Sequence, residues 1–261
     1  MLRTRIATGL IALAAVLAMV TLAPAGLFTA FIAVVTAWGL YEVASMYASG
    51  QPLLMLPLAL VGGVPAAWIL LGHVPDWPSP AVLILAMAGL MVLVGVRGAG
   101  DRAHLLSTAL LGSLYVGVLF PYFALLRNQP QGIRLVIVML LLVVASDTGA
   151  YLAGNRWGHT KLAPRVSPGK TVEGAIASVA SSLVAVVLLR RMLPGVETVS
   201  RALVFALIIN LLAQIGDLAE SALKRIAGVK DSGWLFPGHG GLLDRTDSLV
   251  FAAVFTYYYT K

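Results

Sequence analysis

Long apolar segments separated by short polar breaks constrain this chain more than any other feature. A run of about 20 apolar residues can cross a bilayer as a helix. Glycine, proline and amide residues cluster between such runs, for example at Gly50-Gln51-Pro52 and Asn128-Gln129-Pro130. The sequence therefore predicts an all-α, polytopic integral membrane protein with about nine transmembrane helices, at residues 6–23, 26–48, 53–72, 79–97, 103–126, 132–153, 172–193, 200–226 and 242–259.

Composition excludes the common soluble classes. Of the 261 residues, 59% are hydrophobic and 11% are charged, whereas a soluble domain is usually about 25% charged. The chain has no cysteine, which excludes disulfides, thiolate nucleophiles and cysteine metal sites. Basic cytoplasmic loops explain the net charge of +7, and anionic lipid headgroups or nucleotide phosphates are further reasons for it.

The N-terminal segment resembles a secretory signal. Arg3 and Arg5 precede an apolar run, and Ala23-Pro24-Ala25 resembles a cleavage site. The next apolar run begins almost at once, so we interpret the first run as an uncleaved membrane helix.

The distribution of basic residues predicts the orientation in the membrane. With nine helices, the N-terminus and the loops after helices two, four, six and eight carry 12 of the 18 lysines and arginines. The positive-inside rule then places these segments in the cytoplasm. We predict about five helices in residues 1–130 and about four in residues 131–261. The second region carries the polar motifs and two cytoplasmic loops, at 154–171 and 227–241.

A first polar motif spans the end of the sixth predicted helix and the loop after it. Asp147 lies inside an apolar run, and on a helix it shares a face with Tyr151 and Gly154. An acid at this depth indicates a functional site, or alternatively a polar residue satisfied by helix packing. The segment from Ser167 to Thr171 (SPGKT) precedes a helix, so a lysine, hydroxyls and free backbone N–H groups could bind phosphate there. An ordinary basic loop explains the segment equally well.

A second polar motif begins inside the eighth predicted helix. Asp217, Ser221 and Lys224 share one helix face, while Asp244 and Asp247 lie three residues apart at the start of the ninth. Acids from two helices at one membrane depth could hold Mg²⁺, which prefers oxygen ligands together with substrate phosphates. The alternatives are intramembrane ion pairs, such as Asp217 with Lys224 or Asp244 with Arg245, and basic residues that only set topology.

The second motif resembles the signature of the phosphatidate cytidylyltransferase (CDP-diacylglycerol synthase) family. That signature contains a serine, a Lys-Arg pair, a Lys-Asp pair, a Pro-x-His-Gly-Gly turn and an Asp-Arg-x-Asp end. This chain fills the positions with Ser221, Lys224-Arg225, Lys230-Asp231, Pro237-Gly238-His239-Gly240-Gly241 and Asp244-Arg245-Thr246-Asp247. The first motif is also similar to the family, so the resemblance covers roughly residues 140–250.

The resemblance implies an enzyme that converts CTP and phosphatidic acid to CDP-diacylglycerol and pyrophosphate. It also implies a multi-pass protein of a bacterial-type inner membrane, a homodimer, Mg²⁺ dependence and a potassium ion near the magnesium. No nucleic acid partner is expected. Asp217 and Asp244 would bind the metal. The catalytic candidates are Asp217, Asp244, Asp247, Lys224 and Arg245, and the substrate-binding candidates are Asp147, Ser167, Lys170, Thr171, Ser221, Arg225, Lys230, Asp231, His239, Gly240 and Gly241.

Two other functions compete with this expectation. In a transporter or channel, the intramembrane acids would couple to ions. In a lipid kinase, CTP would donate its terminal phosphoryl group and the products would be CDP and a lipid phosphate. A purely structural membrane protein would not need three acids beside a basic loop.

Overall fold

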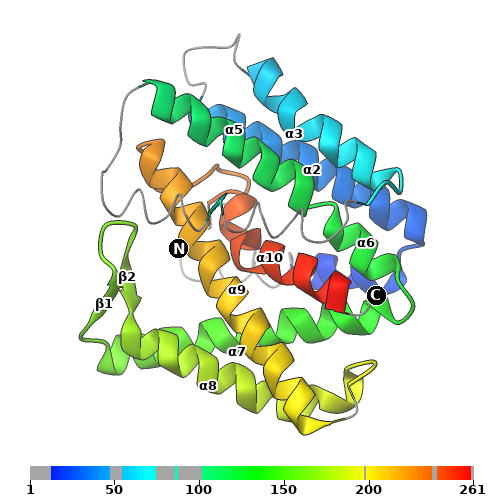
Figure 1. Ribbon diagram of the computed structural model, residues 1–261, viewed down its shortest axis with the longest axis vertical. Helices are drawn as coiled ribbons and strands as arrows, with labels where there is room; N and C mark the ends of the chain where they lie inside the picture. The colour runs from blue at the N-terminus through cyan, green and yellow to red at the C-terminus, as the bar shows by residue number, and fades with distance from the viewer. Residues whose placement is uncertain are drawn as a thin grey trace.

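The computed structural model describes residues 13–47, 55–74, 86–87, 102–196, 198–236 and 240–259. These residues form an almost entirely helical bundle (Figure 1). After a first helix at Leu13–Leu22, the main elements are α2 (Ala25–Tyr47), α3 (Met55–Leu70), α5 (Arg102–Leu119), α6 (Tyr122–Asn128), α7 (Gly132–Trp157), β1 (Lys161–Ala163), β2 (Ser167–Thr171), α8 (Val172–Leu189), α9 (Val199–Ile226) and α10 (Leu243–Tyr259).

Five helical segments among these residues are long and apolar enough to cross a membrane. They are Ala25–Tyr47, Leu106–Asn128, Gly132–Trp157, Val172–Met192 and Val199–Ile226. The predicted class of an α-helical, multi-pass membrane protein is therefore confirmed. The fourth predicted helix, at 79–97, falls almost wholly outside the described residues.

The bundle departs from the predicted helices at two places. The single helix expected at 103–126 is divided into α5 and α6, because Pro121 has no N–H to continue the backbone ladder. The loop expected at 154–171 is shorter, since α7 continues to Trp157, and it holds an antiparallel hairpin that pairs Lys161 with Thr171. Periodicity favoured helices throughout and carried no signal for so short a hairpin.

The helix α10 lies at the centre of the bundle (Figure 1). In that view α2, α3 and α5 lie together on one side of it, and α7, α8 and α9 on the other. Five consecutive residues of α10, from Val250 to Val254, are fully buried. A helix that is apolar on every face must be surrounded by other helices, which explains this position.

The crossing of α9 and α10 brings the acids of the second motif together. A Cβ atom on Gly216 would overlap the backbone carbonyl oxygen of Asp247, so the helices touch at this glycine. Small residues permit such close helix contacts in membranes. The contact sets Asp217, the next residue of α9, against the first turns of α10.

Candidate active site

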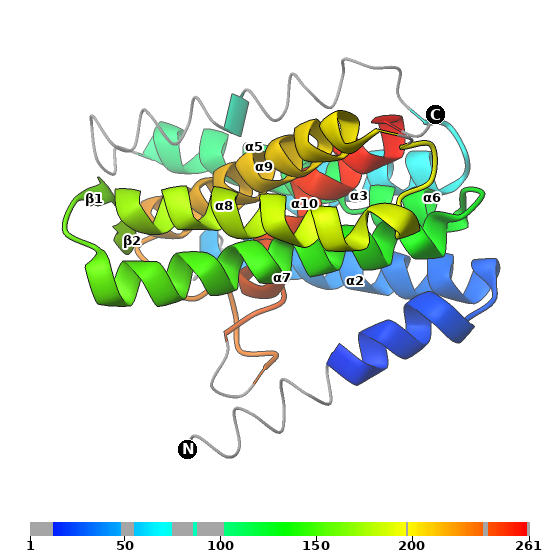
Figure 2. The ribbon, with the colours of Figure 1, turned by 90° about the horizontal axis from the view of Figure 1, so that it is seen from below.

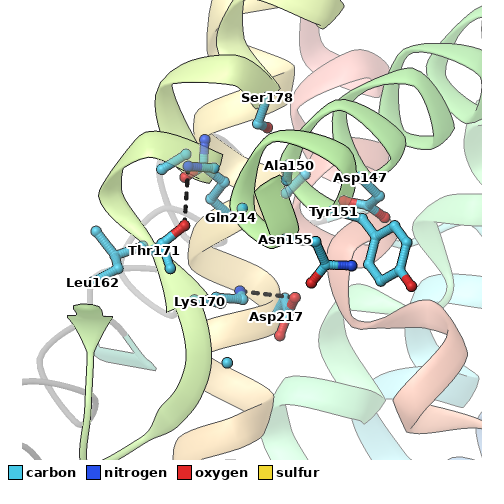
Figure 3. A pocket seen from close by; sticks show the side chains of 15 residues that line it. Asp147, Ala150, Tyr151, Asn155, Leu162, Lys170, Thr171, Ser178, Gln214 and Asp217 are labelled. Atoms are coloured by element: carbon cyan, nitrogen blue, oxygen red, sulfur yellow. Dashed lines mark hydrogen bonds and ion pairs between the residues drawn. The ribbon is translucent and has the colours of Figure 1, made fainter. Parts of the chain in front are cut away.

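A polar cavity of about 290 Å³ lies between α7, α8, α9 and the end of β2 (Figure 3). Glycine and alanine on the three helices leave the space, and eight polar residues line it. Those eight are Asp147, Tyr151, Asn155, Lys170, Thr171, Ser178, Gln214 and Asp217.

The centre of the polar cavity is an ion pair between Lys170 on β2 and Asp217 on α9. The Lys170 Nζ atom lies 2.8 Å from Asp217 Oδ2, and the two side chains point toward one another (Figure 3). They are 24% and 32% exposed, and Ser221 Oγ also donates to Asp217 Oδ1 at 3.4 Å. A solvent-accessible pair of this kind contributes about 1 kcal/mol or less. An anion can therefore compete for Lys170, and a cation for Asp217.

The helix α7 supplies the opposite wall of the polar cavity. Asp147, Tyr151 and Gly154 all line it, so the helix face predicted from their spacing is confirmed. The Asp147 carboxylate interacts electrostatically with both Asp217 and Lys170. Asn155, one turn beyond Tyr151, also lines the cavity and was not among the predicted site residues.

The end of β2 carries Lys170 to the start of α8. Thr171 caps α8, because its Oγ1 atom accepts the N–H of Gly174 at 3.1 Å. The Glu173 carboxylate accepts the N–H of Thr160 at 3.1 Å and so fastens the hairpin to the same helix end. Lys170 thus lies beside a helix N-terminus, which is favourable for anions. Ser167 begins β2, opposite Ala163, and does not line the cavity.

A second polar cluster, the buried network, consists of Glu42, Glu220, Lys224, Ser232 and Asp244. At its centre the Lys224 Nζ atom lies 2.5 Å from both Asp244 Oδ1 and Glu220 Oε2. The residues Lys224 and Glu220 are only 8% and 1% exposed. Lys224 therefore pairs with Asp244 and Glu220, and the alternative pairings of Asp217 with Lys224 and of Asp244 with Arg245 do not describe this arrangement.

Asp244 is held on all sides within the buried network. Besides Lys224, its carboxylate accepts the N–H of Gly241 at 2.7 Å, the N–H of Ser232 at 2.9 Å and the Ser232 hydroxyl at 3.0 Å. The loop that joins α9 to α10 is therefore folded around this carboxylate.

Glu42, on α2, is a central member of the buried network that sequence reasoning missed. It is 2% exposed and accepts the N–H groups of Leu242 at 2.8 Å and Leu243 at 3.0 Å. The indole N–H of Trp38 donates to it at 3.1 Å, and the Ser232 hydroxyl, 2.9 Å away, shares its single proton between Glu42 and Asp244. A carboxylate at this place satisfies the free donors at the start of α10. The available signal was a lone acid inside an apolar helix.

The glycine turn before α10 lets carboxylates approach the backbone. A Cβ atom on Gly241 would clash with Ser232 and with the Glu42 carboxylate, and one on Gly240 would clash with Asp244. Gly240 also adopts a φ of +81°, which favours glycine. In this structure the turn is thus arranged around the protein's own acids. His239 lies outside the described residues.

Four other predicted residues have distinct positions. Arg225 donates to the carbonyl oxygens of Val166 at 3.1 Å and Val229 at 3.3 Å, and so ties the hairpin to the loop after α9. Lys230 and Asp231 are exposed on that loop and do not line the polar cavity. Arg245 is exposed at the start of α10.

The acids near the α9–α10 crossing have the chemistry of a divalent cation site. Asp247 interacts electrostatically with Asp217, and its Oδ1 atom accepts the N–H of Ser248 at 2.8 Å. Among the described residues, no three histidine, cysteine or acidic side chains converge as a ready metal cage. Mg²⁺ commonly binds through one or two carboxylates completed by water and substrate phosphates, so these acids fit it.

Comparison with known proteins identifies a family and several relatives of this chain. Residues 3–261 match the model of the cytidylyltransferase family. A phosphatidate cytidylyltransferase of Bacillus subtilis (strain 168) is 39% identical over 149 residues, which cover 57% of this chain and 55% of that protein. One of Staphylococcus aureus (strain COL) is 34% identical over 201 residues, covering 74% of this chain and 76% of that protein.

A third relative is the protein named YnbB, uncharacterized, of Escherichia coli (strain K12). It is 35% identical over 216 residues, covering 78% of this chain and 71% of that protein. The matched segments thus span from just over half to about three quarters of these relatives.

Proposed function

Since this chain belongs to the cytidylyltransferase family, we propose that it is a phosphatidate cytidylyltransferase. It transfers CMP from CTP to phosphatidic acid and releases CDP-diacylglycerol and pyrophosphate. The observation that carries the proposal is the match to the family over residues 3–261, together with a polar cavity that pairs a lysine with acids.

The reaction needs no nucleophile from the protein. A phosphate oxygen of phosphatidic acid attacks the α-phosphorus of CTP in line. The bond between that phosphorus and the oxygen that bridges it to the β-phosphate breaks, and pyrophosphate leaves. A phosphate monoester has its second pKa at about 6, so near neutral pH little deprotonation is required. The main difficulty is bringing two anions together, so positioning and charge neutralisation account for most of the catalysis.

The polar cavity suits the phosphates of the nucleotide. Lys170 offers its ammonium group beside the N-terminus of α8, and its pair with Asp217 is weak enough to be exchanged. Thr171 and the backbone at the start of α8 complete this side of the cavity, while Asp147 and Asn155 face it from α7.

We also propose that the protein binds Mg²⁺, with Asp217 and Asp244 as its ligands and Asp247 beside them. When bound, the ion would neutralise charge that develops on the phosphates. The accessible pair of Asp217 with Lys170 can open, so the cation would take the place of Lys170, and this lysine would then be available to the substrate phosphates. Asp244 would bind the ion without releasing Lys224, because their buried pair also holds the loop before α10. A potassium ion near the magnesium is part of the same proposal.

The proposed placement in the membrane is about nine spans, with the N-terminus and both polar loops in the cytoplasm. Arg225 bonds the hairpin and the loop after α9 together, so these segments lie at the same end of the helices. An inner-membrane location and a homodimer complete the proposal.

Labelled CTP tests the reaction. The purified full chain would be incubated with phosphatidic acid and CTP labelled at the α-phosphate, with and without Mg²⁺. We expect label in a CDP-lipid only when Mg²⁺ is present. Transfer of label from γ-labelled CTP to the lipid would indicate the kinase instead, and ion flux in liposomes without CTP would indicate a transporter.

A further inference from the structure

A second, apolar cavity of about 480 Å³ lies on the other flank of the bundle. It is lined by the first helix, α2, α6, α7 and the start of α10, and its wall includes Val20, Phe28, Val35, Phe123 and Leu140. Figure 2 shows the first helix, in deep blue, beside α2 at the edge of the bundle. Among its described lining residues, Arg245 and Thr246 supply the polar side chains.

We propose that this apolar cavity binds one acyl chain of phosphatidic acid, with its phosphate toward Arg245. The inference rests on the proposed function and assigns the place of its lipid substrate. A cation next to an apolar cavity matches an amphiphile that carries an anionic phosphate and a hydrocarbon tail.

The position of Arg245 connects the apolar cavity with the acids. Arg245 directly follows Asp244 and precedes Asp247 by two residues, so all three lie in the first turns of α10. A phosphate held at Arg245 would therefore lie at the same end of α10 as Asp244 and Asp247, although Arg245 does not share one helix face with them. Leu242 and Phe236, from the loop folded around Asp244, also line the apolar cavity.

The size of the apolar cavity agrees with a long acyl chain. A methylene group occupies about as much space as a water molecule, roughly 30 Å³, so the cavity can hold on the order of 16 of them. The acyl chain moves from the apolar interior of the bilayer into an apolar cavity, so little hydrophobic free energy is gained. The cavity would therefore contribute position and chain-length preference more than affinity.

Two matched pairs of tryptophan variants test the proposal. Leu140→Trp and Val35→Trp place an indole in the cavity wall, whereas Leu141→Trp and Val34→Trp alter neighbouring exposed residues that do not line it. The activity of each variant would be measured with dioleoyl and with dioctanoyl phosphatidic acid, at saturating CTP. We expect the wall variants to lose about tenfold or more in kcat/KM for the long-chain lipid. The short-chain lipid should change by less than about twofold, and the neighbouring variants should resemble the unaltered protein.

An equal loss with both lipids, or an equal loss in the neighbouring variants, would overturn the acyl-chain assignment. Either result would leave the cytidylyltransferase activity itself in place, because the activity of the unaltered chain is measured in the same experiment.

Photo-crosslinking gives a readout that does not depend on turnover. Phosphatidic acid with a diazirine in one acyl chain should label peptides of α2 and α7, and unlabelled phosphatidic acid should compete. Equal competition by phosphatidylcholine would mean that bulk lipid fills the cavity and would contradict the proposal. Selective labelling without any CMP transfer would support the lipid site and overturn the proposed reaction.

Discussion

The polar cavity and the buried network both pair lysine with aspartate, yet they differ in their access to water. Lys170 and Asp217 are 24% and 32% exposed, whereas the Lys224 and Asp244 side chains are 11% and 7% exposed. An accessible pair contributes about 1 kcal/mol or less, but removing one partner of a buried pair costs about 3–5 kcal/mol. The first pair is therefore suited to exchange with a substrate, and the second to holding the loop before α10.

This difference in exposure indicates that Asp217 and Asp244 have different roles, although both are acids of the same sequence motif. Asp217 faces a cavity together with other charged groups, while Asp244 is surrounded by donors from its own chain. The buried network fixes the start of α10, and the start of α10 in turn carries Asp247 to Asp217. Variants of each region should therefore separate folding from catalysis.

The largest expected effect is the loss of stability in Lys224→Met. This change leaves Glu220 and Asp244 buried without their cation, which should lower the free energy of unfolding by about 3–5 kcal/mol. Intrinsic tryptophan fluorescence during thermal unfolding in detergent would measure it. Arg201→Met, at the exposed start of the same helix, is the control. An unchanged unfolding temperature in Lys224→Met would contradict the claim that the buried network stabilises the protein more than the accessible pair does.

Glu42→Gln should give the next largest effect. The amide keeps the shape but loses a charge that accepts the backbone N–H groups of Leu242, just before α10, and of Leu243, its first residue, and a hydrogen bond to a charged group contributes about 1.5–3 kcal/mol. We expect a loss of stability in that range and a lower kcat. Trp38→Phe removes one donor to the same carboxylate and should have a smaller effect. Wild-type stability and turnover in Glu42→Gln would show that the network does not position α10.

Gly216→Ala tests the helix crossing that links the two regions. The added methyl group overlaps the backbone of Asp247, and overpacking of this kind costs about 1–3 kcal/mol. We expect a lower unfolding temperature, and slower CMP transfer because α10 must move away from Asp217. Gly63→Ala, where the nearest atom lies 3.9 Å from the new methyl group, is the matched control. Equal behaviour of the two variants would contradict the close crossing.

Lys170→Met should have the smallest effect on stability. Its pair with Asp217 is accessible, so the free energy of unfolding should change by less than about 1 kcal/mol. The apparent KM for CTP should rise about tenfold, because a charge-assisted contact to phosphate is lost. Lys161→Met, on the partner strand, is the control. An unaltered KM for both substrates would exclude Lys170 from the site.

Much of the fold follows from local sequence, while the buried network does not. Apolar runs predicted the helix at 200–226 within one residue of Val199–Ile226, and helical spacing predicted the face shared by Asp147 and Tyr151. The partners of Glu42 lie up to 201 residues away, so no local pattern predicts them. The hairpin was missed because its strands are three and five residues long and lack an alternating pattern.

Transfer of α-labelled CMP to phosphatidic acid by Asp217→Asn tests the central claim most directly. The substitution removes a charge at constant volume from an accessible position, so the unfolding temperature should stay unchanged. Label transfer should fall on the order of 100-fold, because the proposed metal site loses a ligand. Wild-type transfer by a folded Asp217→Asn protein would contradict the assignment of the polar cavity as the active site.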